Sequence, residues 1–127
     1  MSTGLKNTLV VILAIIVGGI AIYMFEIFAT NISNQQLSDH NLIKDNPKYL
    51  VLILLAHAIG GIVTGWLIGK FTVQQDNFLV LLAGLFWTII GVANIVTIEH
   101  PVWFAIADTC IYLPMVVIGR KIADLSK

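Results

Sequence analysis

The sequence has few charged residues and a single cysteine. Seven Lys or Arg and seven Asp or Glu make 11% of the 127 residues charged, whereas an average soluble domain has about 25%. The charges cancel, so no basic field favours nucleic acid as a partner. Cys110 alone excludes an intramolecular disulfide and Cys-x-x-Cys chemistry.

Patterns typical of catalytic and metal sites are also missing. The four serines, Ser2, Ser33, Ser38 and Ser126, lie outside the apolar runs, so nucleophilic catalysis has no support. No His-x-x-x-His or Glu-x-x-His pattern occurs, and a zinc site would need ligands from several helices. We therefore expect no enzyme, no metal and no cofactor. Haem or chlorophyll ligation by a histidine within a span remains an open alternative.

What the chain has in abundance is apolar sequence. It is 58% hydrophobic, with a mean hydropathy of +0.94. This composition predicts an all-α polytopic membrane protein, a bundle of four transmembrane helices in a single domain over residues 1–127. The first apolar run is longer than that of a signal peptide, so we expect a span there too. The helices are expected at about 8–30, 47–71, 77–97 and 101–119, with a polar outer loop at 31–46.

Basic residues predict the orientation. With four spans, both termini and the turn after residue 71 share one side, which carries Lys6, Lys70, Arg120, Lys121 and Lys127. The other side carries only two lysines. Because basic residues favour the cytoplasmic side, we expect both termini to lie in the cytoplasm.

The second predicted helix contains a ladder of glycines four residues apart, Gly61, Gly65 and Gly69. Small residues at this spacing lie on one face and let two helix backbones approach closely. The partner is either another helix of the bundle or a second chain. Gly84 and Gly91, seven apart in the third helix, offer a matching face within the bundle.

Two apolar stretches share a short sequence frame. Both Leu13–Phe25 and Leu55–Leu67 read Leu-Ala-x-x-x-Gly-Gly-Ile, and they would cross the membrane in opposite directions. Inverted repeats are typical of transporters. However, Leu, Ala, Ile and Gly dominate any such chain, so we interpret the similarity as chance.

Ionisable residues within the spans are the main functional lead. A charged residue at mid-span costs about 2.5–3.5 kcal/mol on insertion scales. His57, on the glycine face, and Asp108 are both expected about 10–12 Å below the outer surface, from their distance to the helix starts. Asn94 is expected about 7–8 Å deep and Glu26 slightly shallower. Tyr112, one turn beyond Asp108, extends this set inward, as does Thr64.

Two interpretations of these polar residues compete. In the first, His57, Asn94 and Asp108 form hydrogen bonds that fix which helices are neighbours. In the second, an Asp–His pair open to the outer side binds a proton, a cation or a small ligand. Pro114 lies inside the last helix and frees a carbonyl near Asp108, which suits the second interpretation but is also common in membrane helices.

Two of the predicted helices resemble a known family. The segments LLAHAIGGIVTGWLIG, up to Gly69, and EHPVWFAIADTCIYLPMVVIGRKIA, from Glu99, resemble a family of small uncharacterised bacterial four-span inner-membrane proteins. That family has a His-Ala-Ile-Gly helix followed by a Pro-x-Trp-Phe helix. The resemblance implies a bacterial inner-membrane location, and it implies no activity.

The function expected first is a non-enzymatic integral membrane protein. It would act as a small subunit or an oligomerising scaffold, with the lipid bilayer, other membrane subunits or further copies of itself as partners. The alternative is a small proton- or cation-coupled transporter or channel that uses the His57–Asp108 site.

Overall fold

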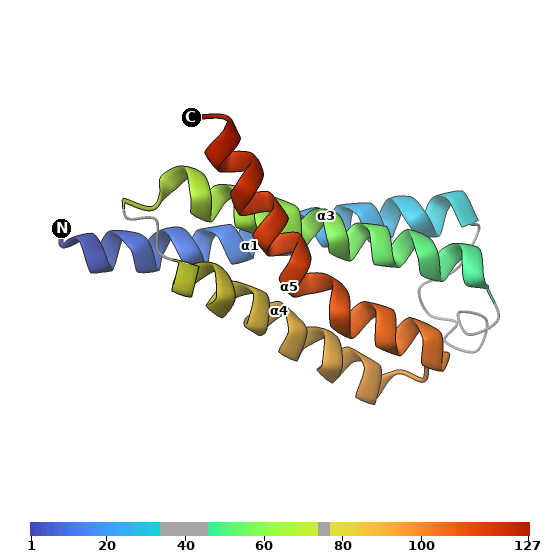
Figure 1. The fold of residues 1–127 in the computed structure, drawn as a ribbon. Coiled ribbons are helices and arrows are strands. Elements are labelled where there is room, and N and C mark those ends of the chain that lie inside the picture. Colours follow the sequence, from blue (N-terminus) through green and yellow to red (C-terminus); the bar gives the residue numbers. More distant parts are fainter. Residues whose placement is uncertain (34–45, 74–76) are drawn as a thin grey trace.

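The described part of the chain forms a bundle of four α-helices, each long and apolar enough to cross a membrane (Figure 1). The computed structural model describes residues 1–33, 46–73 and 77–127, and these ranges contain no strand. The helices are α1 (Thr3–Ser33), α3 (Pro47–Phe71), α4 (Asn77–Thr97) and α5 (Val102–Leu125). They run alternately up and down, so both termini lie at the same end of the bundle (Figure 1).

The two middle helices begin and end where the sequence predicts. Pro47 opens α3, and the side chain of Asn46 caps it by accepting a hydrogen bond from the backbone N–H of Tyr49 at 3.1 Å. Proline suits this position because it has no N–H to leave unpaired. The first helix is longer than predicted at both ends, since α1 begins at Thr3 instead of residue 8 and residues 31–33 continue it instead of opening the loop. The remainder of the predicted loop, up to residue 45, lies outside the described residues.

The predicted bounds of the last helix are wrong at both ends. Pro101 has an extended backbone (φ −60°, ψ 145°) and is the N-cap of α5, not its first helical residue. The helix also continues past Gly119 to Leu125. A glycine near the end of an apolar run is a common stop signal, but Gly119 has a packing role here.

Helix α3 is the centre of the bundle. Within the membrane-length window of each helix, 44% of α3 is buried but only 17% of α1. Helix α3 packs against α1 on one side and α5 on the other, and α4 packs mainly against α5. Functional groups of α3 therefore face two different helices.

The glycine ladder is the contact surface between α3 and α5. A Cβ added to Gly65 would lie 1.9 Å from the carbonyl oxygen of Val116, and one added to Gly119 would lie 2.0 Å from that of Ile62. One added to Gly61 would meet the Val116 backbone nitrogen at 3.5 Å. The two backbones are thus in direct contact, and the partner of the ladder is a helix of the same chain.

The expected match between this ladder and the glycines of α4 is not what the structure contains. Gly84 and Gly91 instead lie beneath side chains of α5, at Leu113 and Tyr112 respectively. The ring of Tyr112 packs closely over Gly91, where an added Cβ would lie 2.4 Å from Cε2. The missing side chain of Gly91 therefore makes room for a residue of the candidate site.

The shared sequence frame marks the crossing of α1 and α3. Cβ atoms added to Gly18 and Gly60 would each lie 2.9 Å from the other residue's carbonyl oxygen. The side chain of Ile22, four residues after Gly18, covers Gly60. In the same way, the side chain of Thr64, four residues after Gly60, covers Gly18. The two copies therefore meet around a local two-fold arrangement, in which the first glycine of each permits the close approach.

Helix α5 bends along its length: its first half follows α4, and its second half crosses α3 (Figure 1). Pro114 lies inside this helix. Proline removes a backbone hydrogen bond and is the usual cause of such a bend. The bend lets one helix contact both of its neighbours.

Candidate functional site

The imidazole of His57 lies between two carboxylates that come from different helices. Its Nδ1 is hydrogen-bonded to Oδ1 of Asp108 on α5. Its Nε2 lies 3.1 Å from Oε1 of Glu26 on α1. His57 itself is on α3, at the top of the glycine ladder, so the three helices α1, α3 and α5 converge on one ring.

Tyr112 completes the cluster from α5. Its hydroxyl lies 2.9 Å from His57 Nδ1 and donates to Asp108 Oδ2 at 3.5 Å. Its ring stacks on the imidazole with centroids 5.3 Å apart. Asp108 and Tyr112 are four residues apart, so the α-helix places both on the face toward His57. We call Glu26, His57, Asp108 and Tyr112 the carboxylate–histidine cluster.

Burial gives this cluster a closed end and an open end. The Asp108 side chain is fully buried (0% exposed) and His57 is 5% exposed, but Glu26 is 30% exposed. The carboxylate of Glu26 therefore reaches the surface of the bundle at α1, whereas that of Asp108 is enclosed between the helices.

The cluster needs a shared proton. A doubly protonated imidazole has one N–H at each nitrogen and could donate to both carboxylates at once. A neutral imidazole has only one N–H, so one of the two carboxylic groups must then carry a proton instead. The number and position of protons are thus the variable property of this site.

The geometry favours proton chemistry over metal or haem binding. The two carboxylates lie at opposite edges of the ring, so they do not converge on one ion, and no group of three potential ligands in the described ranges could hold a metal. Both ring nitrogens of His57 face a carboxylate, so a haem or chlorophyll would have to displace one.

Glu26 is deeper than the sequence suggested. Because α1 continues to Ser33, Glu26 lies seven residues from the helix end, which is about 10 Å at 1.5 Å per residue. It therefore reaches the level of His57 instead of remaining near the surface.

Asn94 does not belong to the cluster. It is half-buried on α4, on the same face as Trp87 and Gly91. None of the hydrogen bonds between described residues uses its side chain. Tyr112, packed over Gly91, fills the space between α4 and the cluster, so α4 provides no direct ligand for His57.

Helix α4 instead contributes Trp87. The indole of Trp87 stacks on Tyr112 with centroids 6.3 Å apart, and its Nε1–H donates to Thr64 Oγ1 at 3.1 Å. The hydroxyl of Thr64 donates to the carbonyl of Gly60 at 2.8 Å. The position of Trp87 between Gly84 and Gly91 on one helical face was a usable signal that it points inward.

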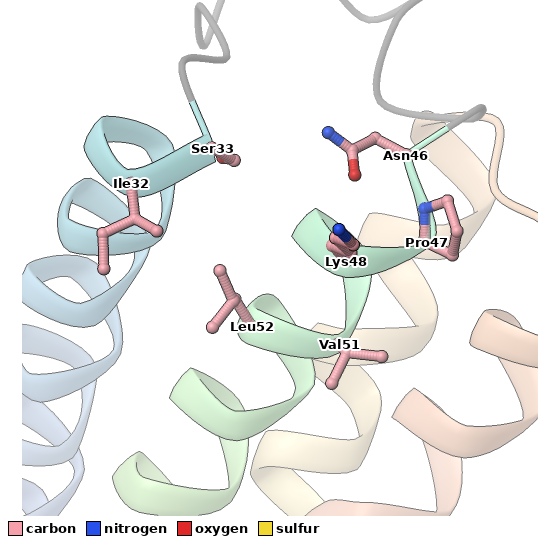
Figure 2. Close-up of a pocket in the computed structure, with 7 residues that line it drawn as sticks. All are labelled: Ile32, Ser33, Asn46, Pro47, Lys48, Val51 and Leu52. Carbon is pink, nitrogen blue, oxygen red and sulfur yellow. The ribbon is translucent and has the colours of Figure 1, made fainter.

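A separate pocket of about 550 Å³ opens at the end of the bundle away from both termini, between the end of α1 and the start of α3 (Figure 2). Ser33 donates to the carbonyl of Ala29, and Asn46 caps α3, so two of its polar groups serve the helices themselves. Ala29 and Ile53 are buried and lie along the helices between this pocket and the cluster. The pocket is therefore not continuous with the candidate site.

No family model, curated protein or solved structure matches the chain, so the functional interpretation depends on the geometry alone.

Proposed function

We propose that this chain is a four-span protein of the bacterial inner membrane that takes up protons at the carboxylate–histidine cluster and carries them across the bilayer. The membrane location is supported by the four long apolar helices, and the bacterial inner membrane is what the sequence resemblance of α3 and α5 implies. The proposed orientation, with both termini in the cytoplasm, follows from the basic residues gathered at their end.

One observation carries the proposed activity: a buried imidazole whose two nitrogens each face a carboxylate from a different helix. Histidine is the side chain whose ordinary protonation equilibrium lies closest to neutral pH. Two carboxylates beside it provide alternative positions for the same proton. A proton that arrives at Glu26 can thus move through His57 to Asp108 by short transfers.

A purely structural role would not require these residues. Polar contacts between membrane helices contribute only about 0.6 kcal/mol on average, and neutral amides supply them as well as charged groups do. Placing ionisable groups in a span costs more than that. The combination of two acids and a base is therefore better explained by a function that uses their charge.

In the proposed pathway the proton enters at Glu26, the exposed carboxylate of the cluster, and the way toward the inside is closed. Inward from the cluster lie Trp87 and Thr64, and beyond them the glycine contacts between α3 and α5, where backbones touch. A proton therefore passes inward only when α5 moves relative to α3. Pro114 gives α5 a weak point close to Asp108, which suits such a movement.

The test is proton flux into liposomes that contain the purified protein. A pH gradient is imposed across the bilayer, valinomycin with potassium removes the opposing voltage, and an enclosed pH dye reports the internal pH. We expect wild-type liposomes to lose the gradient faster than empty ones. Asp108→Asn and His57→Gln should lower the rate to that of empty liposomes while helix content and elution volume stay unchanged.

Asn94→Ala is the matched control. Asn94 is a polar residue of the same half of the bundle that lies outside the cluster, so its loss should leave the flux unchanged. Wild-type flux equal to that of empty liposomes would contradict the proposal. So would full flux in Asp108→Asn, or equal losses in Asp108→Asn and Asn94→Ala.

A second candidate function is a small subunit or oligomerising scaffold without enzyme activity. The observation that favours it is the surface of α1, which exposes large apolar side chains along most of its length, among them Leu13, Ile20 and Phe28. Other membrane subunits or a second copy could cover this surface, although lipid would do so too. The mass of the assembly extracted in mild detergent tests this function. A complex with other polypeptides supports the subunit role, and a lone monomer contradicts both the subunit role and the oligomerising-scaffold role.

A further inference from the structure

An apolar groove of about 360 Å³ runs between α1 and α3 at the end of the bundle that holds both termini. Residues of α1 and α3 line it: Lys6, Val10, Leu13, Ala14 and Val17 from α1, and Leu67 and Phe71 from α3. The α1 residues recur every three or four positions, so they form one stripe along the helix. From Lys6 to Val17 this stripe is eleven residues long, which is about 16 Å.

The groove has a cation at one end only. Lys6 is exposed and lies at the terminal end, and no carboxylate of the described residues pairs with it. Lys70, next to Phe71, donates to the backbone carbonyl and hydroxyl of Ser126, which are neutral acceptors. Lys6 thus provides the positive charge at the mouth of the groove, and the remaining lining residues are apolar.

We propose that this groove is a binding site for one anionic glycerophospholipid of the cytoplasmic leaflet. An acyl chain fits an apolar groove of this length, and the phosphodiester head would lie beside Lys6, at the terminal end of the groove. The negative head complements the amine of Lys6, and the cytoplasmic surface is where anionic lipids attract basic side chains. The site rests on the membrane location and orientation given above, but not on proton transport.

The test uses native mass spectrometry of the detergent-solubilised protein, titrated with dioleoyl phosphatidylglycerol or dioleoyl phosphatidylcholine. The two lipids have the same chains and differ in head charge. We expect one preferred phosphatidylglycerol per chain, bound at least about fivefold more tightly than phosphatidylcholine, since one lysine near an anionic head is worth about that factor.

Two pairs of variants separate the parts of the site. Lys6→Gln should remove most of the preference for phosphatidylglycerol, whereas Lys121→Gln, an exposed lysine at the same end but outside the groove, should not. Leu13→Trp should weaken both lipids by filling the groove. Ile12→Trp, on a different face of α1 with similar exposure, should leave binding unchanged.

Equal affinity for the two lipids would overturn the proposal, and so would equal effects of Lys6→Gln and Lys121→Gln. Asp108→Asn should bind phosphatidylglycerol as the wild type does, because the cluster is remote from the groove. A flux assay can therefore fail while lipid binding succeeds, or the reverse, and the two proposals are tested independently.

Discussion

The substitution Gly65→Ala tests how closely α3 and α5 are packed. A Cβ at this position would lie 1.9 Å from the carbonyl oxygen of Val116 and 2.7 Å from its carbonyl carbon. Both atoms belong to the backbone, so no side-chain rotation can relieve the clash. Because real Cβ contacts are not shorter than 3.0 Å, the helices must separate by about 1.1 Å at this point.

This separation should cost about 3 kcal/mol, the upper end of the range for overpacked sites. Alanine is the better helix former by about 1 kcal/mol, which offsets part of the loss. We therefore expect a net loss of about 2 kcal/mol in the free energy of unfolding. Reversible unfolding with increasing SDS in mixed micelles, followed by circular dichroism, measures it.

Gly19→Ala is the matched control for this measurement. Gly19 is also a mid-helix glycine, but an added Cβ would meet only Cη2 of the Trp87 side chain, at 3.3 Å. We expect stability to be unchanged or raised by up to about 1 kcal/mol, because the side-chain atom can shift by the few tenths of an ångström required and alanine is the better helix former. If Gly65→Ala costs less than about 1 kcal/mol, or if the two variants cost the same, the inferred backbone contact is wrong.

Two further substitutions have defined outcomes. Tyr112→Phe keeps the ring stacked on His57 and Trp87 but removes the hydroxyl. We expect a loss of about 0.6–1 kcal/mol in the free energy of unfolding and a slower proton flux. An unchanged flux would place the hydroxyl outside the pathway. Arg120→Met should leave stability equal or raised by up to about 1 kcal/mol. The Arg120 Nη1 is buried without a partner in the described part of the chain, and the ion pair that Nε loses is with Asp124, an exposed carboxylate that still pairs with Lys127. Thermal unfolding in detergent measures this change, and a loss above about 1 kcal/mol would show that the guanidinium is satisfied after all.

The helices could be predicted well where local signals mark their ends. Asn46 and Pro47 provide a cap and a first residue, and both are found in those roles. The end of the last helix was predicted wrongly at Gly119, because a glycine after an apolar run can either end a helix or permit a close contact with another helix. Only the position of Ile62 on another helix decides between them, and the sequence does not contain that distance.

Depth in the bundle was also predictable, but rotation about each helix axis was not. Counting residues from the helix starts placed His57 and Asp108 at one level, and the structure brings their side chains together. The same count placed Asn94 nearby, although its side chain takes no part in the cluster. Which side chain fills the space beside His57 depends on the volumes of side chains from several helices. Here the ring of Tyr112, packed over Gly91, fills the space between α4 and the cluster.

The proposed function links the cluster to the glycine contacts because α5 carries both. Asp108 faces His57 at the outer end of the α3–α5 interface, and Val116 and Gly119 touch α3 further inward. A movement of α5 that opens the inner contacts must therefore also change the distance between Asp108 and His57. Conversely, a proton that neutralises one partner weakens the attraction that holds the two helices together at the outer end. In the proposed function, loading the site and opening the inner contacts are therefore coupled through one helix, α5.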